Sequence, residues 1–325
     1  MLKTNAQARA DKARGPSRWG MALYATIGLS IGIGLLYWLW QKAGTTLEGH
    51  DLVAILPVLP WVLLWYFVPM FAGNMSWLCL FPKRKRPPVT TSYVMTWIGM
   101  GVNWLLPVAM VGGEVVKLRL ALRRSWNPYA LIASLVGDKT LQVATQGLFT
   151  MVGLSCLVIL SGRADGWWQA LIGAVIFVGA VFVFYKLQTV GIFSGLAAKL
   201  ARFSKQESLM NLRAARVDAA LRLMYRRQSL WWQAAGWRMG FRFLWALEVV
   251  IVLQWQGVEA GLLHAIALES LSQGARAAAF IIPAGIGAQE AGLMAVGLFL
   301  GLPAEALLLL AVVKRLRELI IGGVS

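Results

Sequence analysis

Two glutamates, Glu114 and Glu290, stand in apolar parts of the chain, and each follows a proline by seven residues with glycine in between. Each is followed by a cation at the same spacing, Lys139 in the first case and Arg315 in the second. A charged side chain at a lipid-facing helix centre costs roughly 2.5–3.5 kcal/mol, so these groups must pair or face a polar interior. Acids and bases at membrane depth can hold a polar headgroup or carry a proton. The pattern therefore predicts a polar binding site inside an apolar protein.

The segments that precede the glutamates are poorly suited to unbroken helices. The first holds Pro107 and Gly113, and the second holds Pro283, Gly285 and Gly287. Backbone that leaves helical geometry at membrane depth must be buried in protein or line a wet cavity. The two prolines are separated by the same interval as the two glutamates, which indicates an internal duplication. We expect two helix breaks around one site, although the glutamates could simply cap the helices that restart after the breaks.

Other polar residues lie close to these breaks in the sequence. Glu269, Gln273 and Arg276 form a single helical stripe that leads to the second break. We expect this stripe to be the polar wall of a path, with Arg276 contacting an anionic or hydroxyl-rich headgroup. Asp138 and Lys139 are neighbours and cannot share a helix face, so one of them should point at the site.

Arg238 and Arg242 are one helical turn apart near the cytoplasmic end of an apolar span. Long basic side chains at such a position can extend along apolar surface and keep their charge in the headgroup region. We expect this snorkelling, and not a role in the site, for both arginines.

Together these arguments give a substrate-binding site with no catalytic residue, no metal ligand and no cofactor. The expected residues are Asn103, Pro107, Gly113, Glu114, Asp138, Lys139, Gln273, Arg276, Pro283, Gly285, Gly287, Glu290, Lys314 and Arg315.

The composition places the chain among membrane proteins. Hydrophobic residues make up 58% of its 325 residues and charged residues only 14%. The net charge of +17 does not indicate nucleic-acid binding, because the basic residues flank apolar spans as the positive-inside rule expects.

Charge flanks and apolar runs predict an all-α polytopic fold. We expect a disordered basic cytoplasmic tail at 1–18 and a single transmembrane domain at 19–325. Six crossings and two re-entrant helical hairpins of opposite orientation would form an inverted repeat, with repeat 1 at about 89–160 and repeat 2 at about 257–321. Eight conventional transmembrane helices are the alternative. The excess of basic residues at 186–228, with apolar residues at helical spacing, predicts a basic amphipathic helix that lies on anionic lipid headgroups.

These motifs also carry a family resemblance. The stretches from Asn103 to Glu114 and from Pro283 to Glu290, with Lys314 and Arg315 after them, resemble the flippase-like membrane domain of lysylphosphatidylglycerol synthases and its stand-alone relatives. Within that group the chain looks most like the membrane protein associated with hopanoid biosynthesis. The resemblance implies lipid translocation or lipid transport across a bacterial inner membrane, with a hopanoid or related polar lipid as cargo. Our leading hypothesis is alternating access at a polar cavity near the midplane. Both termini would be cytoplasmic.

Two other functions stay open on the sequence. The chain could be a non-transporting, lipid-binding scaffold, in which the basic helix at 186–228 recruits lipid-biosynthesis enzymes. It could also be an intramembrane lipid-modifying enzyme, because paired carboxylates can do acid–base chemistry. No nucleophile–histidine pair or phosphate loop accompanies the carboxylates, which disfavours the enzyme. The expected partners are membrane lipids, with no nucleic acid.

Overall fold

The computed structural model describes residue 53 and residues 56–83, 86–105, 112–124, 126–162, 207–278 and 287–325. The expected tail at 1–18 and the first half of the basic segment lie outside the described residues. Two of the six expected crossings, which we place at 19–40 and 167–185, also lie outside them. So do Pro107, Pro283 and Gly285, at the centres of the two expected breaks.

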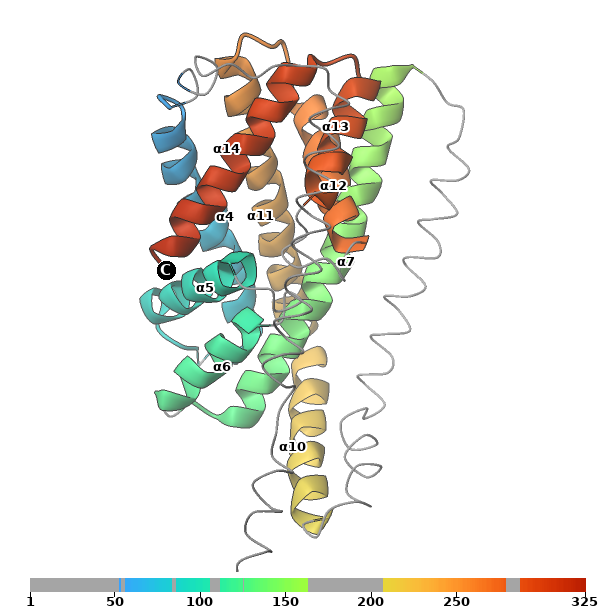
Figure 1. The fold of residues 1–325 in the computed structure, drawn as a ribbon. Helices are drawn as coiled ribbons and strands as arrows, with labels where there is room; N and C mark the ends of the chain where they lie inside the picture. Colours follow the sequence, from blue (N-terminus) through green and yellow to red (C-terminus); the bar gives the residue numbers. More distant parts are fainter. Residues whose placement is uncertain are drawn as a thin grey trace, which may run out of the picture.

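The described part of the chain is helical and contains no strand, which confirms the all-α class (Figure 1). Its helices are α4 (Leu59–Cys79), α5 (Val89–Leu105), α6 (Gly112–Arg123), α7 (Pro128–Ser161), α10 (Glu207–Tyr225), α11 (Gln228–Trp255), α12 (Leu262–Ala278), α13 (Ala288–Phe299) and α14 (Ala304–Gly323).

Each of the two segments in which the sequence predicts a helix break contains a pair of short helices. α5 and α6 contain 17 and 12 residues, and α12 and α13 again contain 17 and 12. At 1.5 Å per residue, a 12-residue helix reaches about 18 Å, well short of a hydrocarbon core of roughly 30 Å. The described parts of α6 and α13 are therefore too short to cross alone, and the choice between re-entrant hairpins and eight conventional spans stays a prediction. Among the described helices, α4 and α7 are long and apolar enough to cross a membrane.

Within each pair the two helices pack closely on one another. A Cβ added to Gly113 of α6 would lie only 2.0 Å from the carbonyl oxygen of Gly99 on α5. In the second pair, a Cβ on Gly292 of α13 would lie 2.8 Å from the Cβ of Ala275 on α12. Glycine at these contacts lets the two backbones approach, as small residues do at helix interfaces in membranes.

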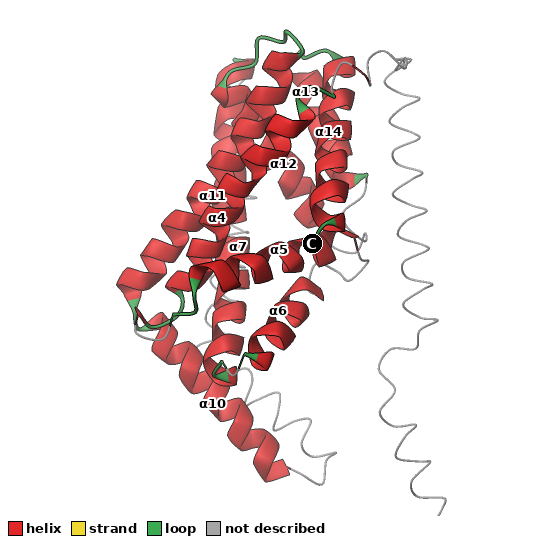
Figure 2. Cartoon of the chain, turned by 90° about the vertical axis from the view of Figure 1, so that its left-hand side faces the viewer, coloured by secondary structure: helices red, strands yellow, loops and turns green. Residues whose placement is uncertain are grey.

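Helix boundaries repeat with the interval that separates Glu114 from Glu290 in the sequence. This same interval separates both the starts and the ends of α6 and α13, the starts of α7 and α14, and the ends of α4 and α11. The packing follows the same correspondence, since α7 packs on α12 while α14 packs on α5. The two views agree that the α5–α6 pair and the α12–α13 pair lie toward opposite ends of the bundle (Figures 1 and 2).

Two long helices hold these pairs in place. α11 packs along α4, and α7 contacts α6 and packs along α12 (Figure 1). α7 starts sharply because the side chain of Asn127 accepts hydrogen bonds from the backbone nitrogens of Tyr129 and Ala130, at 3.0 and 3.2 Å. It ends at Gly162, whose φ of 62° places it in the left-handed region that glycine favours.

The described part of the expected basic amphipathic helix is α10. Its apolar residues Val217, Leu221 and Met224 are buried in a cluster with residues of α4 and α7. Protein therefore covers this apolar face of α10, whereas the contact of the basic residues with anionic headgroups stays a prediction. Arg222 of α10 and Arg226, directly after the helix, are exposed.

Candidate functional site

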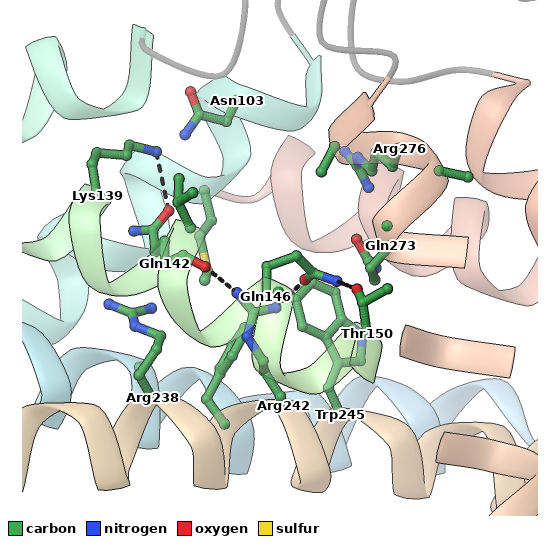
Figure 3. Close-up of a pocket in the computed structure, with 18 of the residues that line it drawn as sticks. Asn103, Lys139, Gln142, Gln146, Thr150, Arg238, Arg242, Trp245, Gln273 and Arg276 are labelled. Carbon is green, nitrogen blue, oxygen red and sulfur yellow. Dashed lines mark hydrogen bonds between the residues drawn. The ribbon is translucent and has the colours of Figure 1, made fainter. Parts of the chain in front are cut away.

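A cavity of about 980 Å³ lies between the two helix pairs. Its lining comes from α4, α5, α6, α7, α11 and α12. Figure 3 shows Arg238, Arg242 and Trp245 of α11 directed toward a polar row on α7, with Asn103 on one side and Gln273 and Arg276 on the other. The volume is within the range of sites for small molecules and cofactors, roughly 300–1,000 Å³.

The first glutamate and its distant cation meet at this cavity. Lys139 Nζ lies 3.0 Å from Glu114 Oε1, and Lys117 Nζ lies 3.6 Å from Glu114 Oε2. All three residues line the cavity. Asn103 Oδ1 accepts a 2.8 Å hydrogen bond from the backbone nitrogen of Gly113, which fixes the start of α6 against the end of α5. Glu114 thus lies in the first turn of α6 and forms an ion pair with Lys139 of α7.

The second glutamate and its cation also meet, but in a different environment. Arg315 Nε donates to Glu290 Oε1, and Glu290 Oε2 accepts a 2.8 Å hydrogen bond from the backbone nitrogen of Gly287. Gly287 has a φ of 85°, which side-chain-bearing residues rarely adopt, so glycine is needed at this helix start. Glu290 therefore combines the two alternatives that the sequence left open, helix capping and ion pairing.

A further carboxylate extends this second cluster across three helices. Glu318 accepts hydrogen bonds from Arg315 Nη1 at 2.7 Å and from Arg276 Nη1 at 2.8 Å. The same nitrogen of Arg276 donates to Gln289 Oε1 at 2.8 Å. This ionic cluster (Glu290, Arg315, Glu318, Arg276) ties the end of α12 and the start of α13 to α14.

Two more buried ion pairs lie beside the cluster. Lys314 Nζ donates to Glu269, which also accepts a 2.9 Å hydrogen bond from Gln273 Nε2. Arg317 donates to Glu248, and its guanidinium stacks over the rings of Tyr66 and Trp245.

Asp138 and Lys139 point in different directions, as their adjacency requires. Asp138 is buried and pairs with Arg238, while Lys139 lines the cavity and donates to Gln142 at 3.2 Å. Arg238 is only 4% exposed, so the snorkelling expected for it is wrong. It is also wrong for Arg242, which lines the cavity and hydrogen-bonds to α7.

The structure separates residues that the sequence placed in a single site. Asn103, Glu114, Lys139, Gln273 and Arg276 line the cavity. Glu290, Lys314 and Arg315 form ion pairs beside it and are not among its lining residues. Gly113, Gly287 and Asp138 contact neighbouring residues without lining it. The two glutamates that the sequence placed in one site therefore lie in two separate groups of ion pairs in the described part of the chain.

Several lining residues were missed from the sequence. Gln142, Gln146 and Thr150 continue the row begun by Lys139 on α7, at spacings of three, four and four residues. This helical stripe of amides and a hydroxyl in an apolar span was a readable signal. The clustering of Glu318 with Arg276 had no such signal, since it joins two different helices at positions far apart in the chain.

A comparison with protein families matches residues 25–324 to the transmembrane region of lysylphosphatidylglycerol synthase. The chain belongs to this family. The lysylphosphatidylglycerol synthase transmembrane region is a multi-pass membrane domain linked to flippase-like lipid translocation, and it is the non-catalytic part of those enzymes. Comparisons with curated proteins and with solved structures gave no match.

Proposed function

We propose that the protein moves a polar lipid between the leaflets of a bacterial inner membrane by alternating access. The observation that carries this proposal is the cavity between the two helix pairs, which combines charged, amide and apolar lining in a member of a flippase-like family. A lipid headgroup would occupy the polar part while the hydrocarbon chain stays beside apolar residues.

The duplication supports a two-state mechanism. The first acid–base pair, Glu114 with Lys139, lines the cavity, whereas the equivalent pair, Glu290 with Arg315, is closed within the ionic cluster. If the two halves have opposite orientation, a second state can exchange their conformations. In that state Glu290 and Arg315 would line a cavity, and Glu114 and Lys139 would be closed off. Inverted repeats of this kind place their substrate site near the midplane where broken helices meet.

The ionic cluster is the part that must open in this mechanism. Glu318 contacts cations from α12 and α14, so separating these helices breaks its contact with Arg276. We propose that the two glutamates and their distant cations stabilise the closed form of each half in turn.

A leaflet assay on the purified full chain in proteoliposomes tests the proposal. Phospholipids with a reporter on one acyl chain and different headgroups are placed in one leaflet, and their appearance in the other leaflet is measured over time. We expect transport in the wild type and at least a tenfold slower rate in Glu290→Ala, Arg315→Ala and Glu114→Ala. Glu305→Ala removes an exposed carboxylate from the start of α14 and should transport normally.

Two results would refute the assignment. Wild-type protein that moves no lipid of any headgroup would remove the transport function. Normal transport in all three variants, with normal expression and folding, would leave transport but remove these residues from it.

The hopanoid cargo, like the cytoplasmic position of both termini, stays a prediction. A labelled hopanoid polyol in the same assay tests the cargo directly, because preferred transport over phospholipids supports it and the reverse contradicts it.

A further inference from the structure

Arg242 differs from the other buried and half-buried cations that line the cavity or lie beside it in the described helices. Those cations each contact at least one carboxylate: Lys117, Lys139, Arg238, Arg276, Lys314, Arg315 and Arg317. Within the described residues, Arg242 contacts only neutral acceptors. Its Nε donates to Thr145 Oγ1 at 3.1 Å, its Nη2 donates to the carbonyl oxygen of Gln142 at 2.6 Å, and its Nη1 donates to Gln146 Oε1.

The neighbours of Arg242 hold its guanidinium at the cavity without neutralising its charge. Gln146 accepts from Arg242 and uses its own amide nitrogen to donate to the carbonyl oxygen of Ser270 at 3.2 Å and to Thr150 Oγ1 at 3.1 Å. These contacts connect α11, α7 and α12 around the guanidinium (Figure 3). A cation removed from water without a counter-ion is costly, and a bound anion would offset that cost.

The charge of the cavity lining favours an anion as well. Five cations line it, against the single carboxylate of Glu114 among the described residues: Lys117, Lys139, Arg238, Arg242 and Arg276. The carboxylate of Asp138 is turned away toward Arg238. Within the described part of the chain, four of these cations already contact a carboxylate, so Arg242 is the one whose charge is left for an incoming headgroup. A net negative headgroup would supply that missing counter-ion, whereas a zwitterionic headgroup would also bring its own ammonium among the cations.

The row on α7 also indicates an amphiphile and not a free ion. Lys139, Gln142, Gln146 and Thr150 supply its polar part, and the stripe continues with Met151 and Leu154, which also line the cavity. A molecule that fills this space needs a polar end beside Arg242 and an apolar end beside the later turns of α7.

We propose that Arg242 binds the headgroup anion of the cargo, and that this cargo is a lipid with a net negative headgroup such as a phosphate diester. The proposal rests on the transport function proposed above and adds the charge of the molecule transported. Arginine suits this role because its planar guanidinium stays charged and forms paired hydrogen bonds to phosphate.

Arg276 supplies a second contact at the edge of the same cavity. Its Nη1 is used by Glu318 and Gln289, while its Nε and Nη2 are buried with no hydrogen-bond partner among the described residues. An anion that binds these nitrogens would use N–H groups that Glu318 does not occupy, and would share the charge of the guanidinium with it. One guanidinium would thereby connect the headgroup to the ionic cluster that holds α14 to α12.

A binding experiment tests the role of Arg242 without requiring transport. The purified full chain in detergent is titrated with phosphatidylglycerol and phosphatidylcholine that carry the same fluorescent acyl chain, and the dissociation constants are measured by anisotropy. We expect the wild type to prefer phosphatidylglycerol. Because a hydrogen bond to a charged group is a strong one, Arg242→Gln should reduce this preference about tenfold or more.

Gln146→Glu is the sharper variant because it keeps Arg242 and adds a carboxylate beside it. We expect the same loss of preference as in Arg242→Gln. Arg242→Lys keeps the charge and should keep the sign of the preference. The matched control Arg123→Gln removes an exposed cation at the end of α6 and should bind both lipids like the wild type.

The outcomes separate this inference from the transport proposal. The inference is overturned if the wild type binds the two lipids with equal affinity, or if it binds an uncharged hopanoid polyol more tightly. It is also overturned if both Arg242→Gln and Gln146→Glu keep the wild-type preference. Competition by glycerol 1-phosphate as strong as by the lipid would overturn the lipid part. Selective binding of phosphatidylglycerol without leaflet transfer would support the role of Arg242 and refute the transport function. Equally fast transport of both lipids would support the transport function and refute the role of Arg242.

Discussion

The ion pair between Glu248 and Arg317 offers a quantitative test of how the bundle is held together. Both side chains are fully buried, and the guanidinium carbon lies 4.8 Å from the ring centre of Tyr66 and 5.1 Å from that of Trp245. Removing one partner of a buried pair leaves an uncompensated charge and costs about 3–5 kcal/mol. We expect Glu248→Leu to lower the free energy of unfolding by about this amount.

Arg317→Met should cost at least as much, because the two ring contacts are lost as well. Each such contact contributes about 0.5–2 kcal/mol. The double variant should lose less free energy of unfolding than the two single variants lose together, since replacing a buried pair by apolar residues is often neutral or stabilising. This pair favours that outcome, because Glu248 Oε1 and Arg317 Nε and Nη2 have no hydrogen-bond partner among the described residues.

The assay is reversible unfolding of the purified full chain in mixed micelles, followed by helical circular dichroism. We expect the double variant to fall within about 2 kcal/mol of the wild type, whereas the two single losses would sum to about 6 kcal/mol or more. Glu259→Leu removes an exposed carboxylate outside the helices and should change stability by less than about 0.5 kcal/mol. Single variants within about 1 kcal/mol of the wild type, or a double variant that loses the full sum, would refute the reasoning.

Two further predictions concern local geometry. Gly113→Ala places a Cβ 2.0 Å from the carbonyl oxygen of Gly99, so we expect a loss of about 2 kcal/mol or more in the same unfolding assay. Gly240→Ala is its control, because that Cβ meets nothing within 4 Å and should be neutral or stabilising by up to about 1 kcal/mol. Asn127→Ala removes the side chain that caps α7 and should cost about 1 kcal/mol, while an unchanged stability would contradict the capping role.

The sequence alone determined where the helices must break and which acids recur. Proline and glycine act through the local backbone, so the repeated pattern predicted that helices begin close to Gly113 and Gly287, where α6 and α13 start. The equal spacing from glutamate to cation also marked Lys139 and Arg315 as corresponding cations, and the structure shows that each pairs with the glutamate of its own copy.

The tertiary structure decided what each of those pairs does. Whether a polar residue lines a cavity depends on the helices that pack around it, and sequence spacing reports only the face of its own helix. The sequence therefore could not show that Glu290 is closed within the ionic cluster while Glu114 faces the cavity. It also assigned Arg242 to the lipid surface, since only the packing of α11 on α7 places this cation inside.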